Sequence, residues 1–356
     1  MKNDKPLVIL CYPRINFETN YRYSWIPYSL IFIADAIIQQ GLVDVEIFDA
    51  NDQSDDCFKN MVLREKNRLL TVGFSIMTGG AQISHAIELA DWLRRHAPNA
   101  LKIFGGPHVN VLPEQTLRHP VVDCCIVGAG QITFPSAIEA ILNLRTWSEV
   151  PGGWRKLTSG EVLRPSLIVP PDWKLQPIYN WSRFDLSSYV REEEAVATRT
   201  LNYISSYGCC YKCQFCYEQI YQNKYYCLPA SKIIHDFEYL QSTYNVGGIK
   251  IYDANFFVNK SRVDEFIQGY RQRMINLLWA ASIHPRDILI FQKRNPNFLK
   301  ELHQCGCTRL LIGAESGDDD VLKQTIRKSV TAAEILECAR MVDSSGIRGA
   351  YKIGRA

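Results

Sequence analysis

Short apolar runs alternate with segments of helical periodicity along the first half of the chain. Apolar residues that recur with helical spacing indicate amphipathic helices, whereas short uninterrupted apolar runs indicate buried strands. By these criteria Tyr28–Gln40 and Ala81–His96 are helices. The expected strands are Leu7–Cys11, Val45–Asp49, Thr71–Ser75, Lys102–Phe104 and Cys124–Val127. Strands that alternate with helices predict an α/β fold with a parallel, doubly wound, Rossmann-like sheet over residues 1–144.

Three of these strands run into loops that contain glycine. In doubly wound sheets, ligands sit beyond the carboxyl ends of the strands. Glycine in such a loop lets the backbone approach a large flat or phosphate-bearing ligand closely. The alternative is that the glycines only make tight turns between strand and helix. The loops are Ser75–Gly80, Gly105–His108 and Gly128–Gln131.

The alternating pattern stops at Arg145, and residues 145–197 form a segment rich in proline, glycine and tryptophan. Two short apolar runs, Trp154–Leu157 and Val162–Arg164, flank Thr158–Glu161 and predict a β-hairpin. We therefore expect residues 145–197 to be a linker with a hairpin between two domains.

Strand and helix patterns alternate again from residue 198 to the end of the sequence. The expected strands are Leu201–Ser206, Ile249–Tyr252, Leu277–Ser282, Arg309–Ile312 and Arg348–Ile353. The expected helices are Ser231–Tyr244, a segment from Ser261, Asn297–Gln304 and Val330–Ser344. This order predicts a partial (β/α) barrel over residues 198–356, with its active-site residues at the carboxyl ends of the strands. We expect the barrel to be truncated at its C-terminus and to leave an open sheet edge.

Composition narrows the classes of function. With 356 residues the chain is long enough for about two domains. The net charge is only +3, and the basic residues are dispersed, so no nucleic-acid partner is expected. No segment is apolar and long enough to span a membrane, and no signal peptide is evident. The 12 scattered cysteines suit the reducing cytoplasm, where we expect the protein to be located.

Three cysteines with close spacing form the strongest chemical motif of the sequence. Cys209, Cys213 and Cys216 have the spacing C-x3-C-x2-C. Three thiolates on one loop can hold three corners of a 4Fe-4S cluster and leave the fourth iron open to a small chelating molecule. The alternative is a zinc site with Cys227 as a distant fourth ligand, although no second pair of closely spaced cysteines is present.

The cysteine motif, with Phe215 directly before its last cysteine, resembles that of the radical S-adenosylmethionine (SAM) enzymes. The resemblance covers roughly residues 198–354. It implies that the open iron binds SAM and that one electron from the cluster generates a 5′-deoxyadenosyl radical. Asp253 and Asn255 could instead cap the following helix, and Glu315 could be a surface acid. The residues that the resemblance assigns to SAM are Phe215, Tyr217, Asp253, Asn255, Glu315 and Ser316.

The first domain resembles the cobalamin-binding domain that precedes the radical domain in a large group of radical SAM proteins. The resemblance implies a corrin ring on the strand ends. The D-x-H-x-x-G motif of some cobalamin proteins is absent, and Gly128-Ala129-Gly130-Gln131 replaces the G-E-G-E that is common in the family. A direct bond from His108 to cobalt is not expected. The residues assigned to cobalamin are Ser75, Thr78, Gly105, Gly106, His108, Gly128, Gly130 and Gln131.

Taken together, the two resemblances imply an enzyme that uses a 4Fe-4S cluster, SAM and cobalamin. The expected reaction is methyl transfer to an unactivated carbon or to phosphorus, on a small-molecule or peptide substrate. An external electron donor such as flavodoxin or ferredoxin would reduce the cluster. The alternatives are a cobalamin-assisted radical cyclase or rearrangement enzyme, or a truncated protein that binds a cluster or corrin without catalysis.

Overall fold

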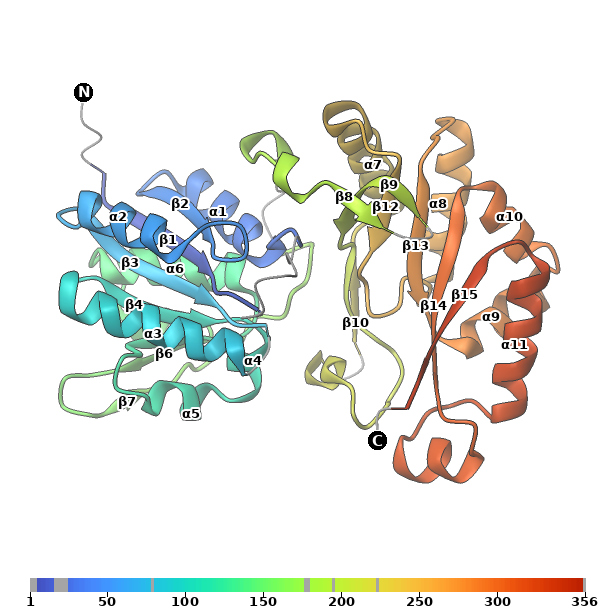
Figure 1. Ribbon diagram of the computed structural model, residues 1–356. Coiled ribbons are helices and arrows are strands. Elements are labelled where there is room, and N and C mark those ends of the chain that lie inside the picture. The colour runs from blue at the N-terminus through green and yellow to red at the C-terminus, as the bar shows by residue number, and fades with distance from the viewer. Residues whose placement is uncertain are drawn as a thin grey trace. The chain divides into compact units, whose positions relative to one another are not determined.

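The computed structural model describes residues 5–15, 25–77, 80–175, 180–193, 196–221 and 224–354. It divides into two compact units, Met1–Ser188 and Tyr189–Ala356 (Figure 1). Each unit is built around its own sheet, and the two are described separately below.

The first unit contains a seven-stranded sheet with the strand order β2-β1-β3-β4-β5-β6-β7. The strands β1 to β5 are parallel, and β6 and β7 add an antiparallel edge. The strands are β1 (Leu7–Tyr12), β2 (Asp44–Asp49), β3 (Leu69–Ser75), β4 (Leu101–Gly105), β5 (Cys124–Ile126), β6 (Gly153–Lys156) and β7 (Val162–Leu163). The helices are α1 (Tyr28–Gln40), α2 (Asp55–Glu65), α3 (Ala81–His96), α4 (Pro107–Val111), α5 (Pro113–Arg118) and α6 (Gly130–Ile141).

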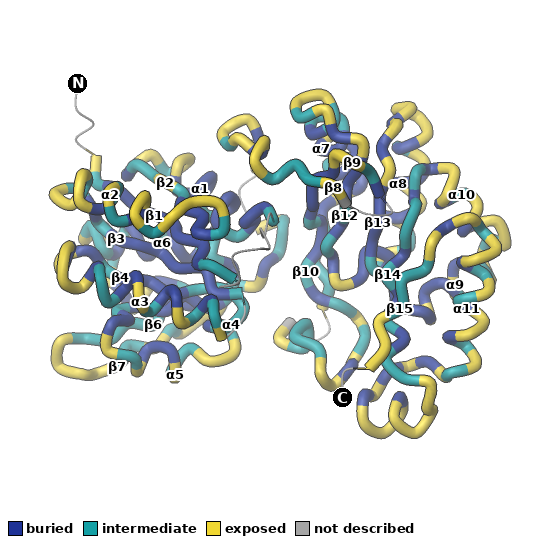
Figure 2. Tube along the Cα trace, in the orientation of Figure 1, coloured by how far each residue is buried: buried dark blue, intermediate teal, exposed yellow. Residues whose placement is uncertain are grey.

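Helices cover both faces of this sheet, and the side chains of β1 show why. Leu7, Ile9 and Cys11 belong to one buried cluster, with residues of α2 and α3. Val8 and Leu10 alternate with them and belong to a second cluster, with residues of α1 and α6. A strand buried on both faces needs a continuous apolar run, which is what the sequence of β1 provides. Figure 2 shows these central strands buried beneath helices with exposed outer sides.

The hairpin expected in the linker is part of the first sheet. β6 pairs with β5, and the backbone N–H of Val127 donates to the Gly152 carbonyl at 2.9 Å. The polar helix α2 was not expected from the sequence. Only Phe58 and Val62 are buried in it, so its apolar period is too weak to recognise.

The second unit contains a six-stranded open sheet with the order β15-β14-β13-β12-β9-β8. All strands but β8 are parallel. The strands are β8 (Arg191–Glu193), β9 (Ala197–Tyr203), β12 (Gly248–Ile251), β13 (Leu278–Ile283), β14 (Cys307–Glu315) and β15 (Arg348–Ile353), and the separate pair β10 (Ser206–Gly208) and β11 (Tyr225–Cys227). The helices are α7 (Ala230–Tyr244), α8 (Lys260–Gln272), α9 (Pro285–Arg294), α10 (Phe298–Gln304) and α11 (Ala332–Ser344).

The parallel order brings the carboxyl ends of β9, β12, β13 and β14 to one edge of the second sheet. These are the strand ends at which the sequence places its candidate residues. The fold class expected from the sequence is therefore confirmed, with a doubly wound sheet followed by a partial (β/α) barrel.

Candidate functional site

The three cysteines of the motif lie on a loop that begins where β10 ends. β10 pairs with β11 in an antiparallel ladder, and Gly208 leaves it with a φ of 80°. The Glu218 carboxylate accepts a hydrogen bond from the Gly208 N–H at 2.7 Å, and the Cys213 carbonyl accepts one from the Cys216 N–H at 3.1 Å. The loop is thus shaped by its own backbone and by the half-buried carboxylate of Glu218.

The sulfur donors suit a multi-iron cluster. None of the three cysteines is in a disulfide, and Cys213 is buried while Cys209 and Cys216 are half-buried. Burial raises the pKa of both Cys213 and Cys216, and the Lys328 ammonium opposes that rise. Binding to a metal must therefore displace protons from these thiols.

Cys227, the fourth ligand of the zinc alternative, lies at the other end of the ladder. It is opposite Ser206, whereas the cysteine loop starts after Gly208, which is opposite Tyr225. Among the described residues, no group of three or more His, Cys, Asp or Glu side chains, the three motif cysteines included, converges on a position for one metal ion.

Asp253 follows β12 and holds the strand that leads to the cysteine loop. Its carboxylate accepts hydrogen bonds from the N–H groups of Ser205 at 2.7 Å and Ser206 at 3.0 Å. It also forms an ion pair with Arg262 at 3.7 Å. The same guanidinium donates to the Tyr225 hydroxyl at 2.7 Å, so that it links β11 to the end of β12. Asp253 is buried and holds the start of the β10–β11 hairpin through these contacts.

Asn255 belongs to a second chain of contacts that reaches the cysteine loop. Its amide donates to Asp287 at 2.6 Å, and its side-chain oxygen accepts from the Phe257 N–H at 3.0 Å. Asp287 also accepts a hydrogen bond from the Tyr211 hydroxyl at 2.8 Å. Tyr211 lies between the first two cysteines of the motif. The cap of α8 is provided by Asn259, so Asp253 and Asn255 do not have that role.

Glu315 is the last residue of β14, at the same edge of the sheet, and Ser316 follows it. Glu315 has a φ of 67°, which is unusual for a residue with a side chain. A side chain at Gly313 would lie 2.9 Å from Glu315 Oε1 and 3.2 Å from Lys328 Nζ, so the glycine leaves space for both groups. Ser316 accepts a hydrogen bond from the Asp318 N–H at 3.1 Å.

The two aromatic candidates are accessible to a ligand. Phe215 is 48% exposed, which is unusual for a phenylalanine, and lies within the cysteine loop. Tyr217 begins a short 3-10 helix, η4 (Tyr217–Tyr221), and is half-buried.

Lys328 and His284 are additional residues at this edge that the sequence did not single out as cofactor contacts. Lys328 is buried, and the segment that carries it packs on the cysteine loop, since the Gln214 N–H donates to the Ile326 carbonyl at 2.8 Å. No sequence pattern marks Lys328. The only signal for His284 was its position at a strand end.

In the first unit, the corrin candidates lie beyond β3 and β4. The Ser75 hydroxyl is 2.8 Å from that of Ser29. Thr78 lies outside the described residues. Gly106 has a φ of 93°, and a side chain there would come within 2.6 Å of the Ile76 carbonyl oxygen. Gly105 has only ordinary contacts with Ile126. The loops after β3 and β4 approach each other so closely that position 106 requires glycine even without a ligand.

Other segments of the same unit pack closely against the loop after β5. A side chain at Gly128 would lie 2.5 Å from the Val169 carbonyl oxygen, and one at Gly130 would lie 2.8 Å from Ile33. The Ala129 N–H donates to the same Val169 carbonyl at 2.9 Å. Chain packing therefore explains both glycines without a ligand, and Gln131 is buried beside them.

His108 lies in α4, half-buried, and burial lowers the pKa of its imidazole. Within the described ranges, the imidazole has no hydrogen-bond partner. Its half-buried side chain therefore retains a polar group with which another molecule could form a contact.

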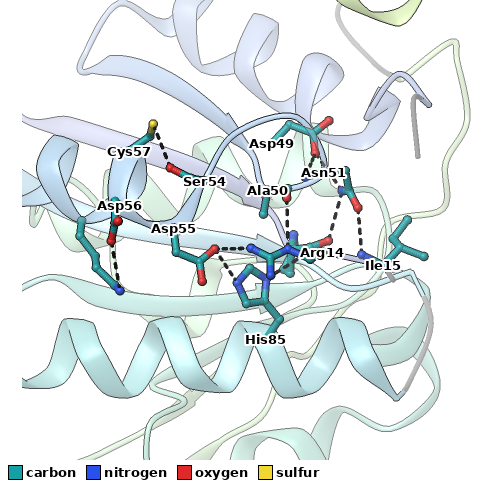
Figure 3. Close-up of polar contacts among 12 residues, drawn as sticks. Arg14, Ile15, Asp49, Ala50, Asn51, Ser54, Asp55, Asp56, Cys57 and His85 are labelled. Carbon is teal, nitrogen blue, oxygen red and sulfur yellow. Dashed lines mark hydrogen bonds and ion pairs between the residues drawn. The ribbon is translucent and has the colours of Figure 1, made fainter. Parts of the chain in front are cut away.

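A polar network that the sequence analysis missed lies at the carboxyl ends of β1 and β2 (Figure 3). The Arg14 guanidinium forms an ion pair with Asp55 at 2.7 Å, and the Arg14 N–H donates to His85 Nδ1 at 2.9 Å. Asn51 accepts from the Ile15 N–H at 2.9 Å. These contacts hold the segment after β1 at the point where the strand order reverses, which is the usual ligand position in this fold.

Comparison with known protein families agrees with this arrangement. Residues 203–354 match the radical SAM superfamily, and residues 19–138 match the B12 binding domain. An uncharacterized methyltransferase of Pyrococcus horikoshii, PH0819, is 24% identical over 265 residues, which cover 72% of this chain and 54% of that protein. The anaerobic magnesium-protoporphyrin IX monomethyl ester cyclase of Cereibacter sphaeroides is 24% identical over 343 residues, which cover 91% of this chain and 52% of that protein.

Among solved structures, the cobalamin-dependent SAM radical enzyme OxsB, with aqua-cobalamin and SAM bound, has the same fold. The TM-score is 0.81 at 20% identity, over 98% of this chain and 49% of OxsB. The chain thus spans about half the length of these relatives. No helix in the described part of the chain has the length and apolar character needed to cross a membrane. The chain thus carries a match to the B12 binding domain followed by a match to the radical SAM superfamily, which is the combination expected from the sequence.

Proposed function

We propose that this protein is a radical SAM enzyme that catalyses cobalamin-dependent methyl transfer to an unactivated carbon or to phosphorus. When bound, the 4Fe-4S cluster and SAM supply the radical, and cobalamin supplies the methyl group. Under this proposal Cys209, Cys213 and Cys216 hold the cluster, and the chain's other groups orient it and exclude water.

The observation that carries the proposal is the position of the cysteine loop. The loop leaves the carboxyl edge of a partial barrel and is held there by the buried Asp253 and by Asn255 through Asp287. Phe215, Tyr217, Glu315 and Ser316 lie at strand ends or on the loop itself, where SAM contacts would be needed. A rigid frame for the loop with an accessible face is the arrangement that a reactive cofactor requires.

On the first unit we propose that cobalamin lies against the carboxyl ends of the parallel strands. The half-buried imidazole of His108 and the loops that contain Ser75, Thr78, Gly105, Gly106, Gly128, Gly130 and Gln131 would contact it. The electron donor would be a flavodoxin or ferredoxin, the substrate a small molecule or peptide, and the compartment the cytoplasm.

A second candidate function is a cobalamin-assisted radical cyclisation without methyl transfer. It is favoured by the likeness to the anaerobic cyclase of Cereibacter sphaeroides, which extends over 91% of this chain.

Anaerobic reconstitution with iron, sulfide and hydroxocobalamin tests the proposal. We expect about four irons per chain, retention of cobalamin on gel filtration and, after reduction, formation of 5′-deoxyadenosine from SAM. Cys213→Ala should lose both iron and SAM cleavage. Cys57→Ser, a change at an exposed free cysteine of the first unit, should lose neither.

Zinc in place of iron would contradict the proposal. Loss of cobalamin would remove methyl transfer, and SAM cleavage with cobalamin bound but no labelled methyl group in any product would favour cyclisation.

A further inference from the structure

His284 carries a buried hydrogen-bond donor that the protein does not use. It is the N-cap residue of α9, and its Nδ1 accepts a hydrogen bond from the Arg286 N–H at 3.2 Å. The proton of the neutral imidazole is therefore on Nε2. His284 is only 6% exposed, and Nε2 has no partner among the described residues.

The imidazole of His284 lies directly against the cysteine loop. It stacks on the ring of Tyr211, with the ring centroids 3.7 Å apart and the planes at 15°. Tyr211 is in turn fixed by its hydroxyl, which donates to Asp287 at 2.8 Å. The stacking leaves the edge of the imidazole, with Nε2, free to face a neighbouring group.

Lys328 brings a positive charge to the same edge of the sheet, with the Glu315 carboxylate on the other side of Gly313. It is 7% exposed, and within the part of the chain that the structure describes its ammonium is not within ion-pair distance of a carboxylate. Its neighbour Ser329 accepts a hydrogen bond from Arg286 at 2.7 Å, so the segment is tied to the start of α9. The Lys328 charge, added to the larger effect of burial, lowers the pKa of His284 to about 2. His284 is thus neutral and remains a donor.

The unused donor of His284 is costly unless an acceptor is present. A buried donor without a partner costs about 1–3 kcal/mol. An iron–sulfur cluster bound by thiolates carries negative charge and presents sulfur acceptors, and hydrogen bonds to those sulfurs set its reduction potential. Such a cluster on the cysteine loop would satisfy both residues.

We propose that His284 donates its Nε2–H to a sulfur of the cluster, and that Lys328 adds its charge, so that together they raise the cluster's reduction potential. This inference rests on the proposed function. The reduced cluster carries one more negative charge than the oxidised cluster, so a donor and a cation stabilise the reduced form more.

Two variants of His284 separate this role from helix capping. In His284→Asn the side-chain oxygen can replace Nδ1 as the cap, whereas the Nε2 donor is lost. In His284→Gln the amide nitrogen can replace Nε2, whereas the cap is lost. Both variants lose the stacking on Tyr211. Lys328→Met and Lys328→Arg form a second pair, which removes or keeps the charge.

The measurement is an anaerobic redox titration of the reconstituted protein, followed by the EPR signal of the reduced cluster in the absence of SAM. We expect His284→Asn and Lys328→Met to reduce the ratio of reduced to oxidised cluster about tenfold at a fixed potential, a shift of about 59 mV for one electron. His284→Gln and Lys328→Arg should stay close to the wild type.

Equal potentials in all five proteins would overturn the inference, and so would a shift that appears only after SAM is added, because the acceptor would then be the cosubstrate. Iron and sulfide content identifies a variant that does not assemble the cluster. If one member of the His284 pair or the Lys328 pair fails in this way, the potentials of the other pair test the inference. A wild-type protein that assembles no cluster would instead contradict the proposed function.

Discussion

His85 Nε2 lies 3.0 Å from Asp55 Oδ1, and this contact fixes the state of a buried histidine. Because the Arg14 N–H donates to Nδ1, the proton is on Nε2 and is donated to Asp55. His85 is 1% exposed, and burial, partly opposed by Asp55, lowers its pKa below the usual value. The network therefore requires the neutral imidazole.

The first prediction concerns the pH dependence of stability. An unfolded chain protonates His85 below a pH of about 6.5, whereas the folded chain resists protonation. Its contribution is therefore complete above that pH and declines as the pH falls, by at most about 1.4 kcal/mol per pH unit. In His85→Asn this part of the slope should be missing. Urea unfolding of both proteins at several pH values measures it, and parallel curves would contradict the assignment.

The second prediction concerns the buried pair of Asp253 and Arg262. Asp253→Ala leaves the guanidinium of Arg262 buried and unpaired, and we expect a loss of about 3–5 kcal/mol in unfolding free energy. Since Asp253 also holds Ser205 and Ser206, iron uptake by the cysteine loop should fall in the same variant.

The control is the double variant Asp253→Asn with Arg262→Met, which removes both charges. It should be less destabilised than Asp253→Ala, because no unpaired charge remains. Equal or greater loss in the double variant would show that the pair's charge is not what matters.

The helices α1 and α3 could be predicted from the sequence because their apolar period is complete. The bounds of α1, α3 and β15 agree with those expected. By contrast, α2 buries too few residues to show a period, and α9 begins with Pro285, separated from the end of β13 by one residue, where no helix was expected. Weak amphipathicity and abrupt connections are what sequence periodicity cannot resolve.

The third prediction separates two costs of replacing glycine. At Gly41, with a φ of 73°, nothing lies within 4 Å of an added side chain, so Gly41→Ala should cost only the backbone strain of about 1–2 kcal/mol. Gly106→Ala adds a clash with the Ile76 carbonyl oxygen and should cost clearly more. Thermal or urea unfolding compares the two. A similar loss in both would mean that the loops can separate freely.

The fourth prediction concerns the segment that follows the first sheet. Asp35 in α1 is 1% exposed, forms an ion pair with Arg183 and accepts a hydrogen bond from the Asn180 N–H at 3.1 Å. Asp35→Asn should weaken this attachment and increase cleavage near residue 180 in limited proteolysis. Asp44→Asn, which affects a more exposed ion pair with Arg68, is the matched control and should leave the cleavage pattern unchanged.

The candidate site was only partly visible in the sequence for a related reason. Asp253 and Asn255 could be placed at a strand end, but their partners Arg262 and Asp287 are contributed by later helices. Lys328 follows a single π-helical turn, Val321–Thr325. No sequence pattern predicts this turn. Strand ends can be read locally, whereas the contacts made there depend on tertiary folding.

The hydrogen bond from Gln214 to Ile326 has a consequence for the order of events in the cell. The cysteine loop receives this support from a segment that leaves the ribosome only after β14 has been synthesised. Until then the loop that carries the three thiols lacks this hydrogen bond. Insertion of iron and sulfide should therefore be a late step, which follows synthesis of most of the barrel and does not guide its early folding.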